Sequence, residues 1–191
     1  HLLPMPVAVA DAGLDVLCAA SRYPRNDAAL IQEKVAIDLG KWIAYARTEL
    51  GYEKVVLLGW SGGGSLSLFY QAQAETPTIT HTPAGDPVDL VGAALQPADG
   101  VIFIAAHLSR AETLTEWLDP SVTNELDPDN RDPELDIYSP DSPNHPPYST
   151  EFVARFRAAQ VARNRRITQS AQNKLAGLKA AGGVEQGRPF V

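Results

Sequence analysis

The chain has 191 residues, of which 45% are hydrophobic and 20% are charged. This length and composition are typical of about one globular domain with an apolar core, and they argue against a disordered chain. The formal net charge of -7 argues against a general nucleic-acid-binding protein, because such proteins usually carry a basic surface. The composition favours a small neutral or hydrophobic molecule as the partner.

Residues 14–20 are predicted to form the first buried strand, bounded by Gly13 and by the polar segment that follows. Cys18, the single cysteine, lies in this run, so we expect a buried structural thiol. One cysteine excludes an internal disulfide and a cysteine-rich metal site. No apolar stretch reaches the roughly 18 residues of a membrane span, and no charged leader is visible, so the sequence predicts a cytoplasmic protein without membrane contact.

A helix is predicted next, because apolar residues recur at steps of three and four and Gly51 is well placed to end the helix. Charged residues such as Glu33 and Arg47 lie off this stripe. The stripe consists of Ile31, Val35, Leu39, Trp42, Ala46 and Leu50.

The most informative motif follows a strand predicted at 54–59. Gly59-Trp60-Ser61-Gly62-Gly63 fits G-x-S-x-G, and a helix is predicted from this glycine-rich turn to about Glu75. A buried strand before the motif and a helix after it are the setting in which such a serine is a nucleophile. The alternative is a glycine-rich turn with a purely structural serine.

The residue types in this turn fit that chemistry. Ser61 would stand at a strained corner, where side chains at positions 59 and 63 would collide with the adjoining strand and helix. The Gly62 N–H would point into the site at the start of the following helix, so it is the predicted oxyanion donor.

A third apolar strand is predicted at 101–106, after a Pro- and Gly-rich surface excursion over 76–99. Apolar strands separated by helices predict a parallel sheet covered on both faces. Bare outer strands of such a sheet invite association, so we also expect a homodimer or larger assembly.

From Ala111 the sequence predicts a long irregular insertion that is rich in acidic residues and proline, followed by a basic helix over about 150–180. The two blocks are opposite in charge, so we expect them to face each other or solvent. Phe152, Val153 and Phe156 give the helix an apolar edge. We therefore divide the chain into a core over 1–107 and a second region over 108–191.

The run from Lys54 to Gly64, with a strand and a helix before it and a strand after it, resembles the central part of the alpha/beta hydrolase family. The resemblance covers residues 7–107, and residues 108–191 resemble the cap that many members carry. It implies an α/β fold, with a parallel sheet flanked by helices and a mostly helical cap. It also implies a serine hydrolase of carboxylesterase type, working through an acyl-enzyme on Ser61 without a cofactor.

The family also carries a second oxyanion donor upstream, and an acid and then a histidine downstream, which this sequence does not visibly supply. The chain therefore resembles a partial member. His107 is the candidate base, because it follows the carboxyl end of the strand 101–106, where ligands of parallel sheets gather. It could equally bind substrate. The other histidines are expected in surface loops or near the oxyanion region: His1, His81 and His145.

No acid stands out for the triad. Asp99 precedes the third strand at its amino end, which predicts a position far from the serine, and the remaining candidates lie in the insertion: Asp119, Asp136 and Asp141. No complete calcium loop, phosphate loop or dinucleotide motif is present, so no metal or cofactor is predicted.

The sequence thus predicts a serine hydrolase that cleaves a small carboxylic ester, with Ser61 as nucleophile, His107 as base, Gly62 as oxyanion donor and Trp60 lining the acyl pocket. Hydrolysis of an amide or a lactone is an alternative within the same chemistry. A catalytically inactive, truncated hydrolase-like module that acts in binding or assembly is the alternative from another class.

Overall fold

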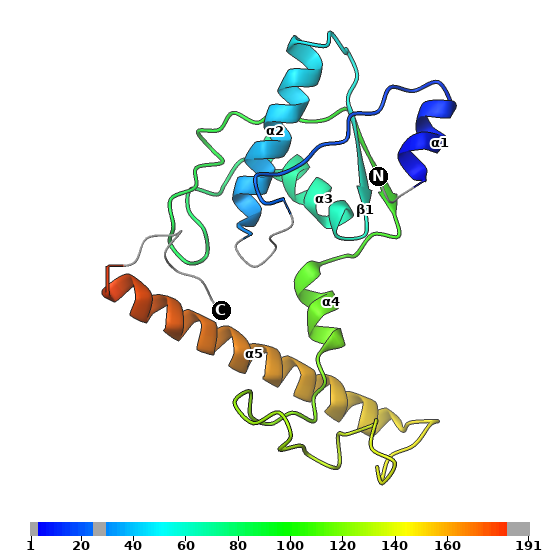
Figure 1. Ribbon diagram of the computed structural model, residues 1–191, viewed down its shortest axis with the longest axis vertical. Helices are drawn as coiled ribbons and strands as arrows, with labels where there is room; N and C mark the ends of the chain where they lie inside the picture. The colour runs from blue at the N-terminus through cyan, green and yellow to red at the C-terminus, as the bar shows by residue number, and fades with distance from the viewer. Residues whose placement is uncertain (1–3, 25–29, 183–191) are drawn as a thin grey trace. The chain divides into compact units, whose positions relative to one another are not determined.

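The computed structural model describes residues 4–24 and 30–182 (Figure 1). The chain forms two compact units, His1–Ile104 and Ala105–Val191. The division follows Ile104, close to the boundary that the sequence predicts after His107.

The first unit is a mixed α/β unit with a small parallel sheet. Its elements are α1 (Met5–Asp11), α2 (Gln32–Thr48), β1 (Val56–Trp60), α3 (Gly62–Glu75) and β2 (Gly100–Ile104). The two strands pair in parallel, with Val56 opposite Gly100 and Trp60 opposite Ile104. Parallel neighbours need a crossover connection, which here contains α3. The structure confirms the strands expected at 54–59 and 101–106, which are β1 and β2. It also confirms the helix expected before the serine motif, α2, and the helix expected after it, α3.

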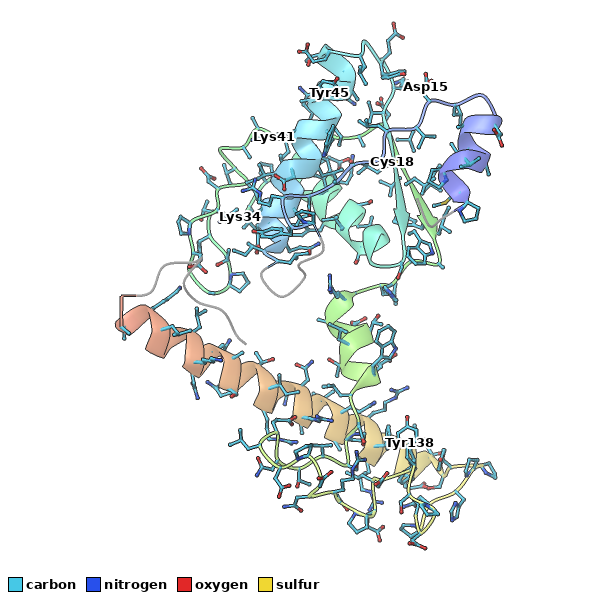
Figure 2. All side chains as sticks on the ribbon, viewed as in Figure 1. Asp15, Cys18, Lys34, Lys41, Tyr45 and Tyr138 are labelled. Atoms are coloured by element: carbon cyan, nitrogen blue, oxygen red, sulfur yellow. The ribbon has the colours of Figure 1, made fainter. Side chains whose placement is uncertain are left out.

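The expected strand at 14–20 is wrong. These residues form no strand, and Leu14 is 64% exposed. Cys18, labelled in Figure 2, is exposed rather than buried. An apolar run becomes a strand only where a neighbouring strand pairs with its amides and carbonyls. In this segment a side chain, and not a strand, binds one of the carbonyls: the Trp42 indole N–H donates to the Ala20 carbonyl at 2.9 Å.

The core of the first unit joins α2, β1 and α3. Its centre is the fully buried Tyr70, whose hydroxyl donates to the Gln96 carbonyl at 2.6 Å. Burial raises the pKa of Tyr70 to about 12. The other buried members of the cluster are Ala36, Ile43, Leu57 and Ala98.

The buried face of α2 shares Val35 and Ala46 with the predicted stripe, but its centre is shifted from that stripe. Ala36 and Ile43 are its most buried apolar residues, whereas Leu50 lies beyond the helix and is exposed. Glu33, which lies off the predicted stripe, is also buried. The packing against Tyr70 selects this face, and the apolar spacing alone could not show which side α3 would occupy.

Asp99, directly before β2, ties the sheet to α2. Its carboxylate accepts hydrogen bonds from the Val55 amide at 2.9 Å, from Lys54 Nζ at 3.0 Å and from Arg47 Nη2 at 2.9 Å. These donors stabilise the ionised form and lower the pKa of Asp99 to about 2. The side chain thus fixes the entry of both strands.

One face of the sheet is open in the first unit. Leu57 of β1 packs in the core, whereas Leu58 and Trp60 point to the opposite face and are exposed, as is Ile102 of β2. The sequence predicted helices on both faces. Among the described residues of this unit, the second face lacks such a cover.

The second unit contains α4 (Arg110–Trp117) and α5 (Thr150–Ala180). The bounds of α5 confirm the predicted basic helix. Helix α4 corrects the expectation of an irregular chain from Ala111. Ser109 caps it, with Oγ accepting from the Glu112 amide at 3.4 Å, and this Ser-x-x-Glu spacing was a helix-start signal in the sequence.

The acidic loop faces the basic helix, which is one of the two arrangements that the sequence predicted. Arg163 of α5 pairs with Glu125 at 2.8 Å, and Arg155 pairs with Glu134 at 3.4 Å. Val122, Leu135 and Phe152 are the buried large apolar side chains of this unit within the described residues.

The Asp99 contacts generate a prediction about pH. The pKa of Asp99 is lowered from 3.8 to about 2 on folding, so the stabilisation is fully present above pH 3.8 and is lost as the pH falls through about 2. Asp99→Asn should therefore lower the free energy of unfolding at neutral pH, and the difference from wild type should shrink across this interval. Urea unfolding over a pH series measures it.

The matched control for this test is Asp129→Asn, because Asp129 is exposed in the second unit and forms no ion pair within the described residues. It should unfold like wild type at every pH. A difference between wild type and Asp99→Asn that stays constant as the pH falls would contradict the assignment.

Candidate active site

Ser61 occupies a strained backbone position between β1 and α3. Its φ is 54° and its ψ is -122°, although it is not glycine. Such conformations cost about 1–3 kcal/mol and persist only where the surrounding structure enforces them. The strand-to-helix corner predicted by G-x-S-x-G is therefore present, with the serine at its apex and half-buried.

Close backbone packing enforces this corner. A Cβ added to Gly59 would contact Gly63 O and would lie 2.6 Å from the Gly63 carbonyl carbon and from Gly64 Cα. No side chain fits there, so glycine is required at position 59. The equivalent expectation for Gly63 is wrong, because a Cβ at Gly63 would meet nothing within 4 Å. The crowded side of the corner faces β1, and a Cβ added at Gly63 would point away from that side.

Two backbone interactions hold the serine in place. The Ser61 amide donates to the Ile104 carbonyl at 3.0 Å, which extends the sheet hydrogen bonding one residue past Trp60. The Ser61 carbonyl accepts from the Gly64 amide at 3.1 Å and so starts the first turn of α3. The serine is thus fixed from the sheet and from the helix.

The Gly62 amide is the first of α3. Amides of a first helical turn have no carbonyl of the preceding turn to bind, and the helix dipole gives this end a positive potential. Further along, Ser65 and Ser67 donate to the Gly62 and Gly63 carbonyls at 3.0 and 2.8 Å. These hydroxyls therefore bind carbonyls, and the role of the Gly62 amide as an oxyanion donor stays a prediction.

Trp60 ends β1 next to the serine. It lies on the open face of the sheet and is 49% exposed, so its indole offers apolar surface beside the corner. Its role in lining an acyl pocket stays a prediction.

His107 belongs to the second unit, where its ring lies against Trp117 of α4. The ring centroids are 6.1 Å apart and the planes are 83° from parallel, which is an edge-to-face contact. Ser61, Gly62 and Trp60 come together in the first unit. The role of His107 as the base of Ser61 stays a prediction.

The remaining candidates have other positions. Asp99 lies at the amino end of β2, as expected, whereas Ser61 follows the carboxyl end of β1. Asp119 and Asp136 both pair with Arg131 in the second unit. Burial opposes ionisation of Asp119, but hydrogen bonds from Ser121 and Arg131 outweigh it, and the net pKa is lowered.

The other histidines fall in loops or outside the described residues. His81 forms an isolated bridge with Pro87, and its Nδ1 lies 3.2 Å from Thr80 Oγ1. His145 is exposed in the loop before α5. His1, which the sequence placed near an oxyanion region, lies outside the described residues. Neither a triad acid nor a second oxyanion donor could be assigned from the sequence.

The described residues contain no group of three or more His, Cys, Asp or Glu side chains that could hold a metal ion. Over the same part of the chain, none of the helices combines the length and the apolar character needed to span a membrane. A scan against protein-family models, a search of curated proteins and a search of solved structures each found no match to this chain.

The geometry of the corner predicts opposite effects for two glycine substitutions. Gly59→Ala would drive Cβ into the backbone of the first turn of α3 and should destabilise the protein by about 1–3 kcal/mol. Gly63→Ala meets open space inside a helix and should be neutral or stabilising by up to about 1 kcal/mol. Urea unfolding of both variants measures the difference. Equal effects would show that β1 and α3 do not meet at Gly59.

Proposed function

We propose that this protein is a serine hydrolase that cleaves carboxylic esters through an acyl-enzyme on Ser61. The observation that carries the proposal is the backbone of Ser61, a non-glycine residue with φ of 54° at a strand-to-helix corner. Strain of this kind is stored where function needs it, and a serine so placed projects its hydroxyl away from the sheet. The close packing at Gly59 supports the same reading, because it leaves the corner no relaxed alternative.

The proposed chemistry has two steps. Ser61 Oγ attacks the ester carbonyl carbon while a base takes its proton, and the carbonyl oxygen becomes an oxyanion that accepts a hydrogen bond from Gly62 N–H. The intermediate collapses to the acyl-enzyme, and the alcohol leaves with the proton. Water then attacks the acyl carbon through the same oxyanion position and releases the acid and the free serine. Trp60 contributes apolar surface for the acyl group.

His107 is the proposed base. Only Ala105 and Ala106 separate it from Ile104, whose carbonyl accepts the Ser61 amide. His107 follows the carboxyl end of β2 in the chain, and ligands of parallel sheets gather at the carboxyl ends of strands. Imidazole is the side chain best suited to exchange protons at neutral pH.

The open face of the sheet bears on two further expectations, which are self-association and a non-catalytic function. Leu58, Trp60 and Ile102 expose apolar surface that a second copy of the chain could cover, and self-association through it stays a prediction. The same surface favours the rival function, a non-catalytic binding or assembly module in which the serine corner is only architecture. Hydrolysis of amides or lactones also stays open, because the corner serves all acyl transfers.

Labelling with a fluorophosphonate tests the nucleophile. The adduct should map to Ser61, and burst release from an activated ester should disappear in Ser61→Ala, since losing a triad member costs about 10⁴-fold in rate. Ser65→Ala is the matched control and should label normally, because its hydroxyl bonds to Gly62 O. Ser61→Gly should lose the label and unfold no more easily, since glycine relieves the strain at φ of 54°. Absence of labelling on folded wild type would favour the non-catalytic module.

His107→Ala should lower ester turnover by about 10²–10⁴-fold with little change in thermal stability. The comparison variant is Trp117→Phe, which keeps an aromatic partner for the imidazole and should retain most of the activity. Turnover that survives in His107→Ala would assign this histidine to packing against Trp117 instead, and the base would be another group.

A further inference from the structure

The second unit contains a cavity of about 480 Å³ between the end of α4, the loop around Tyr138 and the first turns of α5. Its size lies within the roughly 300–1,000 Å³ of small-molecule sites. Five of its twelve lining residues are aromatic, and four are polar or charged. The aromatic residues are Trp117, Tyr138, Tyr148, Phe152 and Phe156. Figure 2 shows Tyr138 beside the amino-terminal end of α5.

The rings are arranged as a floor and a rim. Phe152 is buried, and its ring centroid lies 5.0 Å from that of Tyr148 and 5.8 Å from that of Phe156. Trp117 and Tyr138 are 71% and 77% exposed. Aromatic groups of this size normally bury most of their surface, so two exposed rings at the mouth of an aromatic cavity leave apolar area for a ligand to cover.

The buried side chain of Gln160 holds the guanidinium of Arg157 in place in this cavity. Gln160 is 3% exposed, and its amide nitrogen donates to the carbonyls of Glu116 and Leu118 at 2.6 and 2.9 Å. Its amide oxygen accepts from Arg157 Nη1 at 2.8 Å. The end of α4 therefore positions Gln160, and Gln160 positions the guanidinium of Arg157.

Arg157 differs from three other arginines of α5. Arg155 pairs with Glu134, and Arg163 and Arg166 pair with Glu125, whereas the partner of Arg157 among the described residues is the neutral Gln160. A guanidinium has five N–H donors in a planar fork that matches a carboxylate. Arg157 thus brings to this cavity a positive charge that forms no ion pair within the described residues, together with unused donors.

The acidic residues of the cavity limit the charge of its ligand. Asp119 is engaged by Arg131 Nη1 and by Ser121 Oγ, both at 2.7 Å, and Glu116 is exposed to solvent. Two carboxylates near one guanidinium repel a doubly charged phosphate more strongly than a singly charged carboxylate.

We propose that this cavity binds a small aromatic carboxylate. The aromatic part lies among Phe156, Trp117 and Tyr138, and the carboxylate binds the guanidinium of Arg157. The site belongs wholly to the second unit and does not depend on the activity of Ser61.

Isothermal titration calorimetry with 2-naphthoate, and with neutral 2-naphthalenemethanol of nearly the same shape, tests the proposal on the full chain. Naphthoate should bind one to one and at least about 10-fold more tightly than the alcohol, because hydrogen bonds to a charged group exceed neutral ones. Arg157→Gln should weaken naphthoate by about 10-fold or more and leave the alcohol unchanged. Arg165→Gln, on the same helix, is the matched control and should bind naphthoate like wild type.

Tyr138→Ala is a second variant that tests the same site if the arginine variant does not fold. Tyr138 is exposed, so its removal does not open the core. It should weaken both probes by a similar factor. Circular dichroism melting verifies the fold of each variant. The proposal is overturned if naphthoate does not bind, if it binds no more tightly than the alcohol, if folded Arg157→Gln binds it like wild type, or if Tyr138→Ala leaves both affinities unchanged.

Discussion

The structure of the first unit depends on the direct contact of two backbones at Gly59. There β1 approaches the first turn of α3 so closely that no side chain fits between them. This contact turns the chain through a corner at Ser61 and forces its φ to 54°. It also sets the position of α3, whose Tyr70 centres the core, and hence the face of α2 that becomes buried. The backbone geometry of Ser61 and the core packing are therefore consequences of one steric constraint.

The second unit is held together in a different way, because side chains of α5 bind backbone carbonyls of the preceding segment. Gln160 binds the carbonyls of Glu116 and Leu118, Arg163 binds that of Asp119, and Arg166 binds that of Val122. Loop carbonyls outside regular structure still need donors. The basic composition of α5 thus supplies donors to a loop with little secondary structure of its own, in addition to its ion pairs with the acidic residues.

Local patterns predicted the elements that local chemistry determines. The basic helix has the expected bounds, and G-x-S-x-G located the corner at Ser61, where Gly59 is required by backbone crowding. The predictions failed where the structure of a segment depends on residues that are distant in the sequence. Residues 14–20 read as a strand but pair with no strand within the described part of the chain, and the centre of the buried face of α2 depends on where Tyr70 lies. At Gly63 the motif suggested crowding, yet the direction of α3 leaves that position open. Triad partners likewise depend on tertiary contacts that no local pattern encodes.

The hydrogen bond from the Ser61 amide to the Ile104 carbonyl makes the serine the last rung of the parallel ladder. Its position is thereby tied to the pairing register of β1 and β2, in which Trp60 lies opposite Ile104. A slip of one residue in that register would reverse the faces of a strand and remove the partner of the Ser61 amide. Fraying of the carboxyl ends of the strands would release the same bond. The protection of this one amide from hydrogen exchange would therefore report on the order of the sheet and on the backbone position of Ser61 together.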